Sequence, residues 1–242
     1  MRTIVLSDCH GHPQLVTAAL EDAGFVNGRD RLVFAGDFLD RGPLPAACLE
    51  VLEEAGAEML LGNHDAAILL GQQIWPQDGV SWTFRGRLLE GFAAGAWQLV
   101  AAAHGVLVSH AGVVHPFAPR GADDADELAA ALNARFRVAV LSALRGRADD
   151  SGLLGDFGPL WLRPRSIRSR NLPEVPQVVG HTDPSRVDAD ELAGLGVHMI
   201  DPGVGSLRPG EQPRTVRYAV IDERGARVHH DLLPAVYELA AS

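Results

Sequence analysis

The sequence at residues 32–42 is LVFAGDFLDRG, in which four apolar residues lead into a loop with two aspartates and an arginine. A short apolar run that stops this abruptly is typical of a strand buried on both faces. The same arrangement occurs earlier at residues 3–11, TIVLSDCHG, and later at residues 59–65, MLLGNHD. We therefore predict a buried sheet whose strands each end in a polar loop.

Helical patterns separate these apolar runs. Apolar residues recur with helical spacing from Leu15 to Ala23 and from Leu44 to Ala55, and a glycine follows each series. Alternation of strand, helix and strand predicts βαβ units with right-handed crossovers. The runs around Tyr218 and Val228 have no helix between them and predict an antiparallel pair.

The rest of the chain extends this pattern. The apolar runs are Thr3–Leu6, Leu32–Ala35, Met59–Leu61, Val106–Ser109, Gln177–Val179, His198–Ile200 and Arg217–Ile221. A long helical pattern covers residues 123–146, and residues 145–176 read as a loop. The predicted fold class is α/β, a sandwich of two sheets flanked by helices in four layers (α/β/β/α).

Composition limits the class of protein. With 242 residues, 47% of them hydrophobic, the chain can bury a core, and a single domain over residues 1–242 is expected. A net charge of −10 argues against stable binding of nucleic acid. The longest apolar stretch, residues 93–108, is too short to cross a bilayer. Two cysteines give no disulfide framework and no signal peptide is recognisable, so we expect a cytoplasmic protein without membrane contact.

Polar side chains that bind metals follow five of the predicted strands, usually beside a glycine: Asp8 and His10, Asp37 and Asp40, Asn63 and His64, His110, and His181. Ligands of open α/β sheets bind at the carboxyl ends of strands. Mixed carboxylate, amide and imidazole groups suit manganese, iron or zinc better than calcium. Asp8 and His10 are two residues apart, so an extended backbone would direct both into the site and Cys9 into the core.

These residue types fit phosphate chemistry. A carboxylate such as Asp37 can bridge two ions roughly 3.5–4 Å apart, and metal coordination lowers the pKa of water from 15.7 to about 7. Hydrolysis of phosphate monoesters needs accelerations of up to ~10²¹, whereas a side-chain base alone contributes about 10²–10⁴. The magnitudes favour a metal mechanism for any phosphomonoester substrate.

Taken together, the motifs resemble those of the calcineurin-like metallophosphoesterases, and more narrowly the branch of bacterial and phage serine/threonine phosphatases and symmetrical diadenosine tetraphosphate hydrolases. The resemblance runs in order through Asp8-x-His10-Gly11, Gly36-Asp37-x-x-Asp40-Arg41-Gly42, Gly62-Asn63-His64-Asp65, Ser109-His110-Ala111-Gly112 and Gly180-His181-Thr182. The resemblance also implies that insertions around residues 66–103 and 113–176 face the substrate. Many members have a second histidine where this chain has Asp183, but the serine/threonine phosphatase branch lacks it too.

The resemblance implies two divalent ions, with manganese expected first and iron or zinc as alternatives. It assigns the first ion to Asp8, His10 and Asp37, and the second to Asp37 with Asn63, His110 and His181.

It also implies a catalytic group outside the metal ligands. His64, oriented by Asp40, would protonate the leaving oxygen. Arg41 would bind the phosphoryl oxygens through its bidentate fork. Arg163 resembles a second phosphate-binding arginine of these phosphatases, with a solvated surface role as the other interpretation.

Three functions remain open. The leading hypothesis is hydrolysis of phosphomonoesters, in a phosphoprotein or a small phosphometabolite, by in-line attack of hydroxide. The second is hydrolysis of a dinucleoside polyphosphate, which Asp65 after His64 slightly favours. The third is a non-catalytic scaffold with a phosphoesterase fold. For Trp75, Trp82 and Trp97 we expect core packing, with nucleotide stacking as the alternative.

Overall fold

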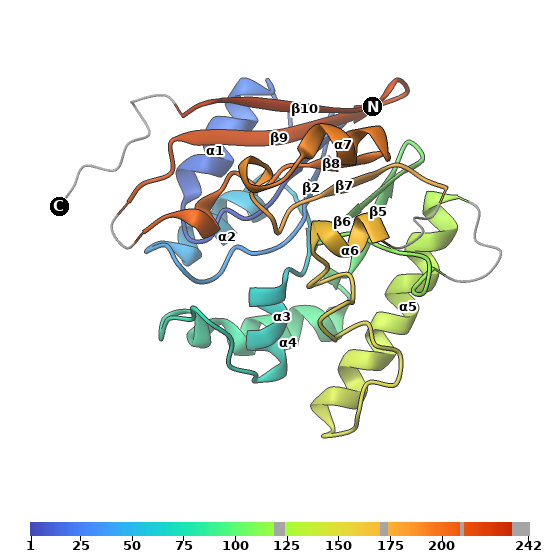
Figure 1. The fold of residues 1–242 in the computed structure, drawn as a ribbon. Coiled ribbons are helices and arrows are strands. Elements are labelled where there is room, and N and C mark those ends of the chain that lie inside the picture. The colour runs from blue at the N-terminus through green and yellow to red at the C-terminus, as the bar shows by residue number, and fades with distance from the viewer. Residues whose placement is uncertain (119–123, 170–173, 209–210, 234–242) are drawn as a thin grey trace.

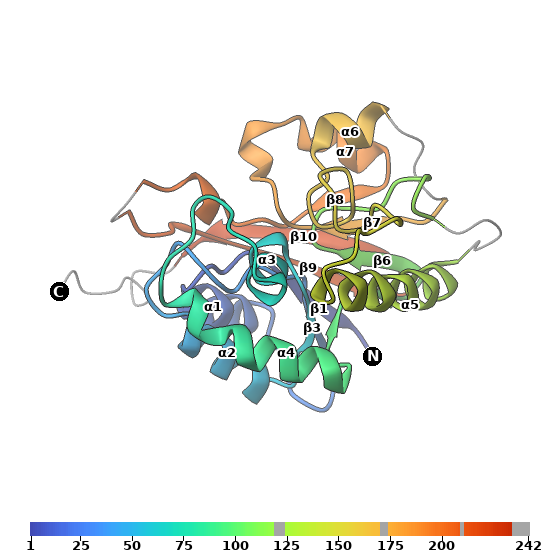
Figure 2. The same cartoon turned by 90° about the horizontal axis from the view of Figure 1, so that it is seen from below.

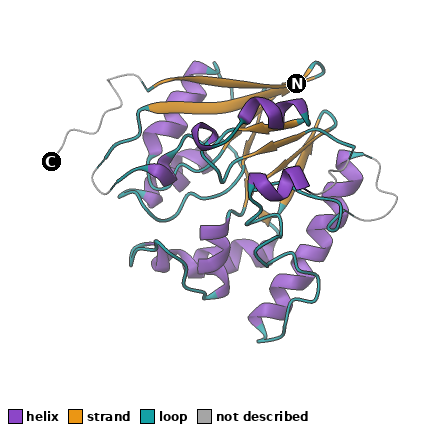
Figure 3. Ribbon diagram, viewed as in Figure 1, coloured by secondary structure: helices purple, strands orange, loops and turns teal. Residues whose placement is uncertain are grey.

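The computed structural model describes residues 1–118, 124–169, 174–208 and 211–233, and its strands form two sheets (Figures 1 and 3). The six-stranded sheet has the order β10-β9-β1-β2-β3-β4, and its strands are β1 (Thr3–Leu6), β2 (Arg31–Phe34), β3 (Glu58–Leu60), β4 (Trp97–Gln98), β9 (Thr215–Asp222) and β10 (Gly225–Leu232). The four-stranded sheet consists, in order, of β5 (Val100–Ala103), β6 (Val106–Ser109), β7 (Gln177–Val179) and β8 (Val197–Met199).

Parallel pairing aligns the strand ends that carry the polar loops. β1 pairs in parallel with β2, which pairs in parallel with β3. In the other sheet β6, β7 and β8 are also parallel neighbours. The carboxyl ends of each parallel set therefore lie at one edge of its sheet. The predicted antiparallel pair is present as β9 and β10.

Buried aliphatic side chains fill the space between the two sheets. Val5 and Val33 from the six-stranded sheet share one cluster with Val108 and Val178 from the four-stranded sheet. The chain crosses between the sheets at Leu99, which is fully buried. This packing explains the continuous apolar runs, because helices cover the other faces of the sheets.

Helices complete the layers. The helices are α1 (Pro13–Asp22), α2 (Pro45–Glu54), α3 (Asn63–Leu70), α4 (Arg85–Ala94), α5 (Ala125–Leu144), α6 (Pro164–Ser169) and α7 (Ala189–Gly194). Figure 2 shows α1 and α2 together on one side of the sheets and α7 on the other, where it packs on β8. α5 lies against β5 and β6. The predicted α/β class with two sheets flanked by helices is confirmed.

Three strands are displaced by one residue from the predicted runs. β2, β3 and β8 each begin and end one position earlier, although Ala35, Leu61 and Ile200 beyond them are fully buried. The hydrogen-bonded pairing of each strand thus ends one residue before the burial does. The predicted runs ended one residue late because an apolar pattern reports burial and not pairing. The strands β4 and β5 were not predicted, because residues 93–108 are rich in alanine and β5 has one β-branched residue.

The segment between β6 and β7 is more helical than predicted. Of the helical pattern at 123–146, Asp123 lies outside the described residues, and α5 begins after Asp124, whose side chain accepts a hydrogen bond from the Glu127 amide at 2.8 Å. α6 lies inside the stretch that we read as a loop. No helix among the described residues has the length and apolarity to cross a membrane.

Candidate metal centre

The loops after the strands adopt an unusual backbone. Non-glycine residues with positive φ include Asp8 (53°), His10 (41°), Asp37 (63°) and His181 (65°). Such conformations cost of order 1–3 kcal/mol each and cluster at functional sites. The expectation of an extended backbone at Asp8 and His10 is therefore wrong. Cys9 between them is nonetheless buried in the core, as expected.

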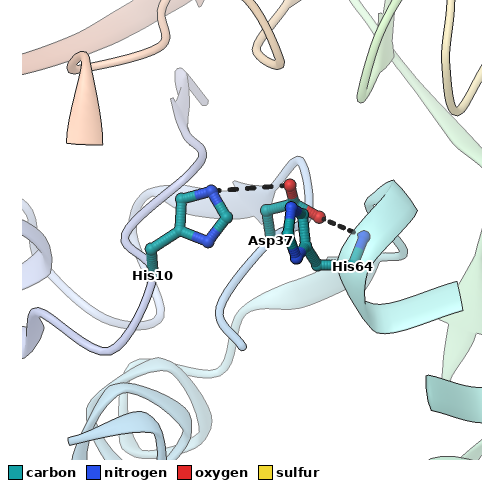
Figure 4. A group of neighbouring side chains, drawn as sticks. All are labelled: His10, Asp37 and His64. Carbon is teal, nitrogen blue, oxygen red and sulfur yellow. Dashed lines mark hydrogen bonds and ion pairs between the residues drawn. The ribbon is translucent and has the colours of Figure 1, made fainter. Parts of the chain in front are cut away.

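Asp37 lies at the centre of the site (Figure 4). Its Oδ2 atom is 3.6 Å from His10 Nε2 and 3.5 Å from His110 Nε2. Its Oδ1 atom accepts a hydrogen bond from the His64 backbone amide at 2.9 Å. One carboxylate from the β2 loop thus faces imidazoles that follow β1 and β6.

Backbone carbonyls orient both imidazoles. His10 Nδ1 lies 2.7 Å from the Leu39 carbonyl oxygen, and His110 Nδ1 lies 2.9 Å from that of Ala35. A carbonyl only accepts, so each Nδ1 carries the proton and each Nε2 presents a lone pair. Those lone pairs face the Asp37 carboxylate across distances too long for hydrogen bonds. Such converging acceptors fit a cation, and the carbonyls are the outer partners that metal-binding histidines use.

A second group of acceptors lies beside the first. His110 Nε2 is 2.9 Å from Asn63 Oδ1 and 3.0 Å from His181 Nδ1. Ligand atoms of Asp37, His110 and His181 all lie within 4.8 Å of one another, as do those of His10, Asp37 and His64. Two adjacent three-residue groups thus share Asp37 and could hold two ions. The first group contains His64 where the motifs place Asp8, which lines the same cavity.

The electrostatics are those of a buried site that needs positive charge. Burial raises the pKa of Asp8 and of Asp37 well above the usual carboxylate value, and neighbouring carboxylates add to the rise. Burial lowers the pKa of His10 well below its ordinary value and that of His110 to about 3. Each shift disfavours the charged form. Divalent cations would reverse this balance for the carboxylates and compete easily with protons for the imidazoles.

Asp8 is placed by the loop after β7. Its Oδ2 atom accepts a hydrogen bond from the His181 amide at 3.0 Å. Gly180 permits this contact, because a Cβ atom there would lie 2.1 Å from Asp8 Oδ2. A Cβ atom at Gly62 would likewise lie 2.0 Å from Asp37 Oδ1. Both predicted motif glycines are thus required by close approach of a carboxylate.

His64 and Asp40 form a buried pair. His64 Nδ1 lies 2.6 Å from Asp40 Oδ2, so the carboxylate orients the ring. On the other side, His64 Nε2 is 3.5 Å from Arg41 Nη2. Arg41 Nη1 also donates to the Gly205 carbonyl at 3.3 Å. The imidazole edge away from Asp40 is therefore beside a guanidinium.

Arg163 also lines the site, together with Arg41. It donates from Nη1 to the His181 carbonyl at 3.2 Å and to Thr182 Oγ1 at 3.3 Å. A cavity of about 220 Å³, here termed the metal-centre cavity, is lined by Arg163 and Arg41 and by most of the predicted ligands. The structure thus brings together every predicted site residue, from motifs as far apart in the chain as Asp8 and His181, which are separated by 173 positions.

Two buried carboxylates of the site were not predicted as site residues. Asp65 accepts backbone N–H groups of Asp37 at 2.7 Å, Gly62 at 3.0 Å and Leu39 at 3.3 Å, so it ties two loops together. Asp201 lines the metal-centre cavity, and burial raises its pKa to about 6. Asp201 follows an apolar run, so the strand-end pattern could have found it.

Asp183, the departure from the broader family pattern, has a local role. Its Oδ1 atom accepts from the Ser185 amide at 2.9 Å, which caps a short 3₁₀ turn. Its Oδ2 atom accepts from Ser206 Oγ at 2.8 Å. Both carboxylate oxygens are thus engaged by serines, although Asp183 also lines the metal-centre cavity.

The tryptophans divide into two kinds. Trp97 is buried and stacks on Phe38 at 5.8 Å between ring centroids, and Trp82 packs against the core, as predicted. Trp75 is 91% exposed, so the predicted core role is wrong for this residue. It lies in the loop between α3 and the 3₁₀ helix η1 (Ser81–Phe84), where few apolar neighbours accompany it in sequence.

Comparison with known proteins places these observations in context. A family model described as calcineurin-like phosphoesterase matches residues 1–141, more than half of the chain. Serine/threonine-protein phosphatase 1 of Salmonella typhimurium is 33% identical over 86 residues, which cover 34% of this chain and 40% of that protein. The symmetrical bis(5'-nucleosyl)-tetraphosphatase of Chromohalobacter salexigens is 39% identical over 71 residues, 28% of this chain and 26% of that protein. The matched segments thus span less than half of these relatives.

Solved structures share the fold over most of the chain. A cold-active protein-tyrosine phosphatase of a psychrophilic Shewanella species aligns with a TM-score of 0.64 at 17% identity, covering 96% of this chain and 80% of that one. A putative diadenosine tetraphosphatase aligns with a TM-score of 0.54 at 21% identity, covering 96% and 93%. At these identities the likeness concerns the fold alone.

Proposed function

This chain belongs to the calcineurin-like phosphoesterase family, and we propose that it is a metal-dependent hydrolase of phosphomonoesters with serine/threonine-phosphatase-like chemistry. The observation that carries the proposal is the convergence of carboxylate, amide and imidazole acceptors on Asp37, in two groups that share its carboxylate.

The proposed ligands divide as the motifs suggest. Asp8, His10 and Asp37 would hold one ion, and Asp37 with Asn63, His110 and His181 a second, with manganese as the first candidate and iron or zinc as alternatives. Bound ions would supply hydroxide at neutral pH and offset the charge of the phosphoryl group.

The remaining groups would act on the phosphoryl oxygens and the leaving oxygen. Arg41 and Arg163, which both line the metal-centre cavity, would bind the phosphoryl oxygens. His64, held by Asp40 at 2.6 Å, would in its doubly protonated form give the Nε2 proton to the leaving oxygen. Burial lowers the pKa of His64, whereas the Asp40 carboxylate favours the protonated form. The proximity of Arg41 Nη2 to that nitrogen puts the phosphoryl group and the acid side by side.

A cytoplasmic location is part of the proposal. Cys9 and Cys48 are both buried and form no disulfide among the described residues. Free thiols suit a reducing compartment.

The test is a substrate panel with added manganese: a phosphopeptide, an aryl phosphate, diadenosine tetraphosphate and a cyclic nucleotide. Hydrolysis of the phosphopeptide or the aryl phosphate supports the proposal. Turnover of the dinucleotide alone would establish the alternative of a dinucleoside polyphosphate hydrolase. A protein that retains metal by elemental analysis and hydrolyses none of the four would be the non-catalytic scaffold.

A further inference from the structure

Trp75 borders two cavities. One is the metal-centre cavity, and the other, here termed the aromatic cavity, has a volume of about 920 Å³. Arg41 is also common to both linings. The two cavities therefore meet at Trp75 and Arg41, and a ligand held in one can extend into the other.

The aromatic cavity has the character of a small-molecule site. Apolar groups from three segments line it, including Pro43, Pro76, Val80, Val204 and Leu207. Its volume lies within the range of about 300–1,000 Å³ that is usual for ligand pockets. In Figures 1 and 2 the loop between α3 and η1 lies on the same side of the molecule as the 3₁₀ turn η3 (Val204–Ser206), which supplies another wall.

The exposed face of Trp75 is available for stacking. Its side chain is 91% exposed, the highest value among the large hydrophobic residues described. Among the described rings, aromatic contacts were found for Trp97 and Trp161 but not for Trp75. An indole left in water at the mouth of a catalytic cavity gains from a planar partner, because stacking buries apolar area on both rings.

The loop that carries Trp75 is joined to the acid pair. The Asp78 amide donates to Asp40 Oδ1 at 3.3 Å, and Asp78 Oδ1 accepts from the Ser81 amide at 2.7 Å. Ser81 Oγ accepts from the Asp40 amide at 2.9 Å. Asp40 also holds His64, so the proposed acid and the aromatic loop share one support.

This arrangement fixes where the leaving group would go. His64 would protonate the leaving oxygen, and its Nε2 atom faces Arg41, which borders the aromatic cavity. We propose that the aromatic cavity binds the leaving group and that Trp75 stacks on a planar aromatic ring within it; this inference rests on the proposed function. The preferred substrates would then be phosphate esters whose leaving group bears such a ring, either a nucleobase or an aryl group.

Matched substrate pairs test this selectivity. Adenosine 5'-monophosphate and ribose 5-phosphate have the same primary leaving oxygen and differ by the base. Benzyl phosphate and cyclohexylmethyl phosphate differ in aromaticity alone, and this pair separates an aryl preference from a nucleobase preference. We expect kcat/KM at least about tenfold higher for the aromatic member of one pair or both, as stacking on one base supplies.

The Trp75→Ala variant should erase that ratio. We expect KM for the aromatic member to rise roughly tenfold with little change in kcat, because Trp75 would contact the ring of the leaving group equally in the ground state and the transition state. Trp75→Phe should restore most of the preference. Phe157→Ala, which removes an exposed aromatic that does not line either cavity, should leave the ratio unchanged.

Two kinetic results would overturn the assignment: a wild-type enzyme with equal kcat/KM within both pairs, or a Trp75→Ala variant that slows both members equally. Calorimetric titration of adenosine and benzyl alcohol, with ribose as the control, tests the cavity without turnover. If either aromatic alcohol binds the wild type and not the Trp75→Ala variant, the aromatic cavity is supported. If in addition no ester is hydrolysed, the proposed function is rejected and the ligand assignment of the aromatic cavity stands. Binding of neither would reject the aromatic cavity.

Discussion

At the scale of single residues, Asp37 has the most demanding position. Its backbone is in the left-handed region, Asp65 holds its amide, and its two oxygens face His64 and the imidazoles of His10 and His110. Fixing a buried carboxylate among neutral acceptors is costly unless a cation compensates. The strained backbone and the burial of Asp37 therefore both fit a residue that holds a cation.

The Asp37→Asn variant tests this. The amide keeps the size of the side chain and can still accept from the His64 amide through Oδ1. It loses the negative charge that would bridge two ions, so we expect metal content and turnover to fall together. Elemental analysis after gel filtration measures the first, and full retention of two ions would rule out a bridging role.

His64→Asn should separate chemistry from metal binding. We expect turnover to fall by about 10²–10⁴, the usual contribution of a general acid, and most for esters with poor leaving groups. Metal content should remain at the wild-type level. Unchanged kcat on such an ester would remove His64 from the mechanism.

Gly180→Ala would act on Asp8 through space. The new Cβ atom would lie 2.1 Å from Asp8 Oδ2 and 2.5 Å from Ser7 Oγ, so the carboxylate must shift. We expect weaker metal binding, measured by metal titration, with a smaller loss of stability. Gly194→Ala is the matched control, because a Cβ atom there meets nothing within 4 Å; equal behaviour of the two variants would contradict the close-approach argument.

At the scale of elements, the strand ends position the site and the helices hold the strands. β9 is joined to α1 by a hydrogen bond from Tyr218 Oη to Asp22 Oδ2 at 2.6 Å. The Tyr218 side chain is buried, and burial together with Asp22 raises the pKa of its phenol. This contact links the layer of helices to the six-stranded sheet, and neither residue lines the metal-centre cavity.

Tyr218→Phe removes that bond while retaining the ring. We expect a loss of about 1 kcal/mol in the free energy of unfolding, since Asp22 is exposed and water replaces part of the interaction. Urea denaturation measures the loss, and kcat should be unaffected. A variant as stable as the wild type would show that water fully replaces the hydrogen bond that Asp22 accepts from Tyr218.

Elements also show where pattern reading succeeds. The strand at Thr3–Leu6 was predictable, because burial on both faces leaves a continuous apolar run. The helix from Pro13 was predictable, because burial of one stripe leaves apolar residues at helical spacing. β5 was not, since three of its four residues are alanine, which suits helix and strand cores alike. α3 begins within the GNHD motif, whose polar residues gave no helical stripe.

At the scale of the whole molecule, the proposed metal binding would be coupled to folding. The proposed ligands come from loops after β1, β2, β3, β6 and β7, so ions would tie both sheets together. A ligand that binds only the folded state adds about 2.7 kcal/mol at a hundredfold excess over its Kd.

Chelation should therefore lower the melting temperature by several degrees, at about 2–4 °C for each kcal/mol in a chain of this size. Differential scanning fluorimetry with EDTA and then with manganese measures the change. Asp37→Asn should respond much less to either addition. If neither EDTA nor manganese changed the melting temperature of the wild type, ions that join loops of both sheets would be contradicted.

The sequence by itself determined the fold class and the family resemblance and singled out the candidate strand-end ligands, because burial periodicity and short motifs are local properties of the chain. Only the tertiary structure decided that residues from Asp8 to Asp201 line one cavity, that Asp8 and His10 adopt left-handed backbone, and that Trp75 lies exposed at its mouth. Those facts depend on how distant segments pack. Neither spacing nor hydrophobicity along the chain records which loops meet across two sheets.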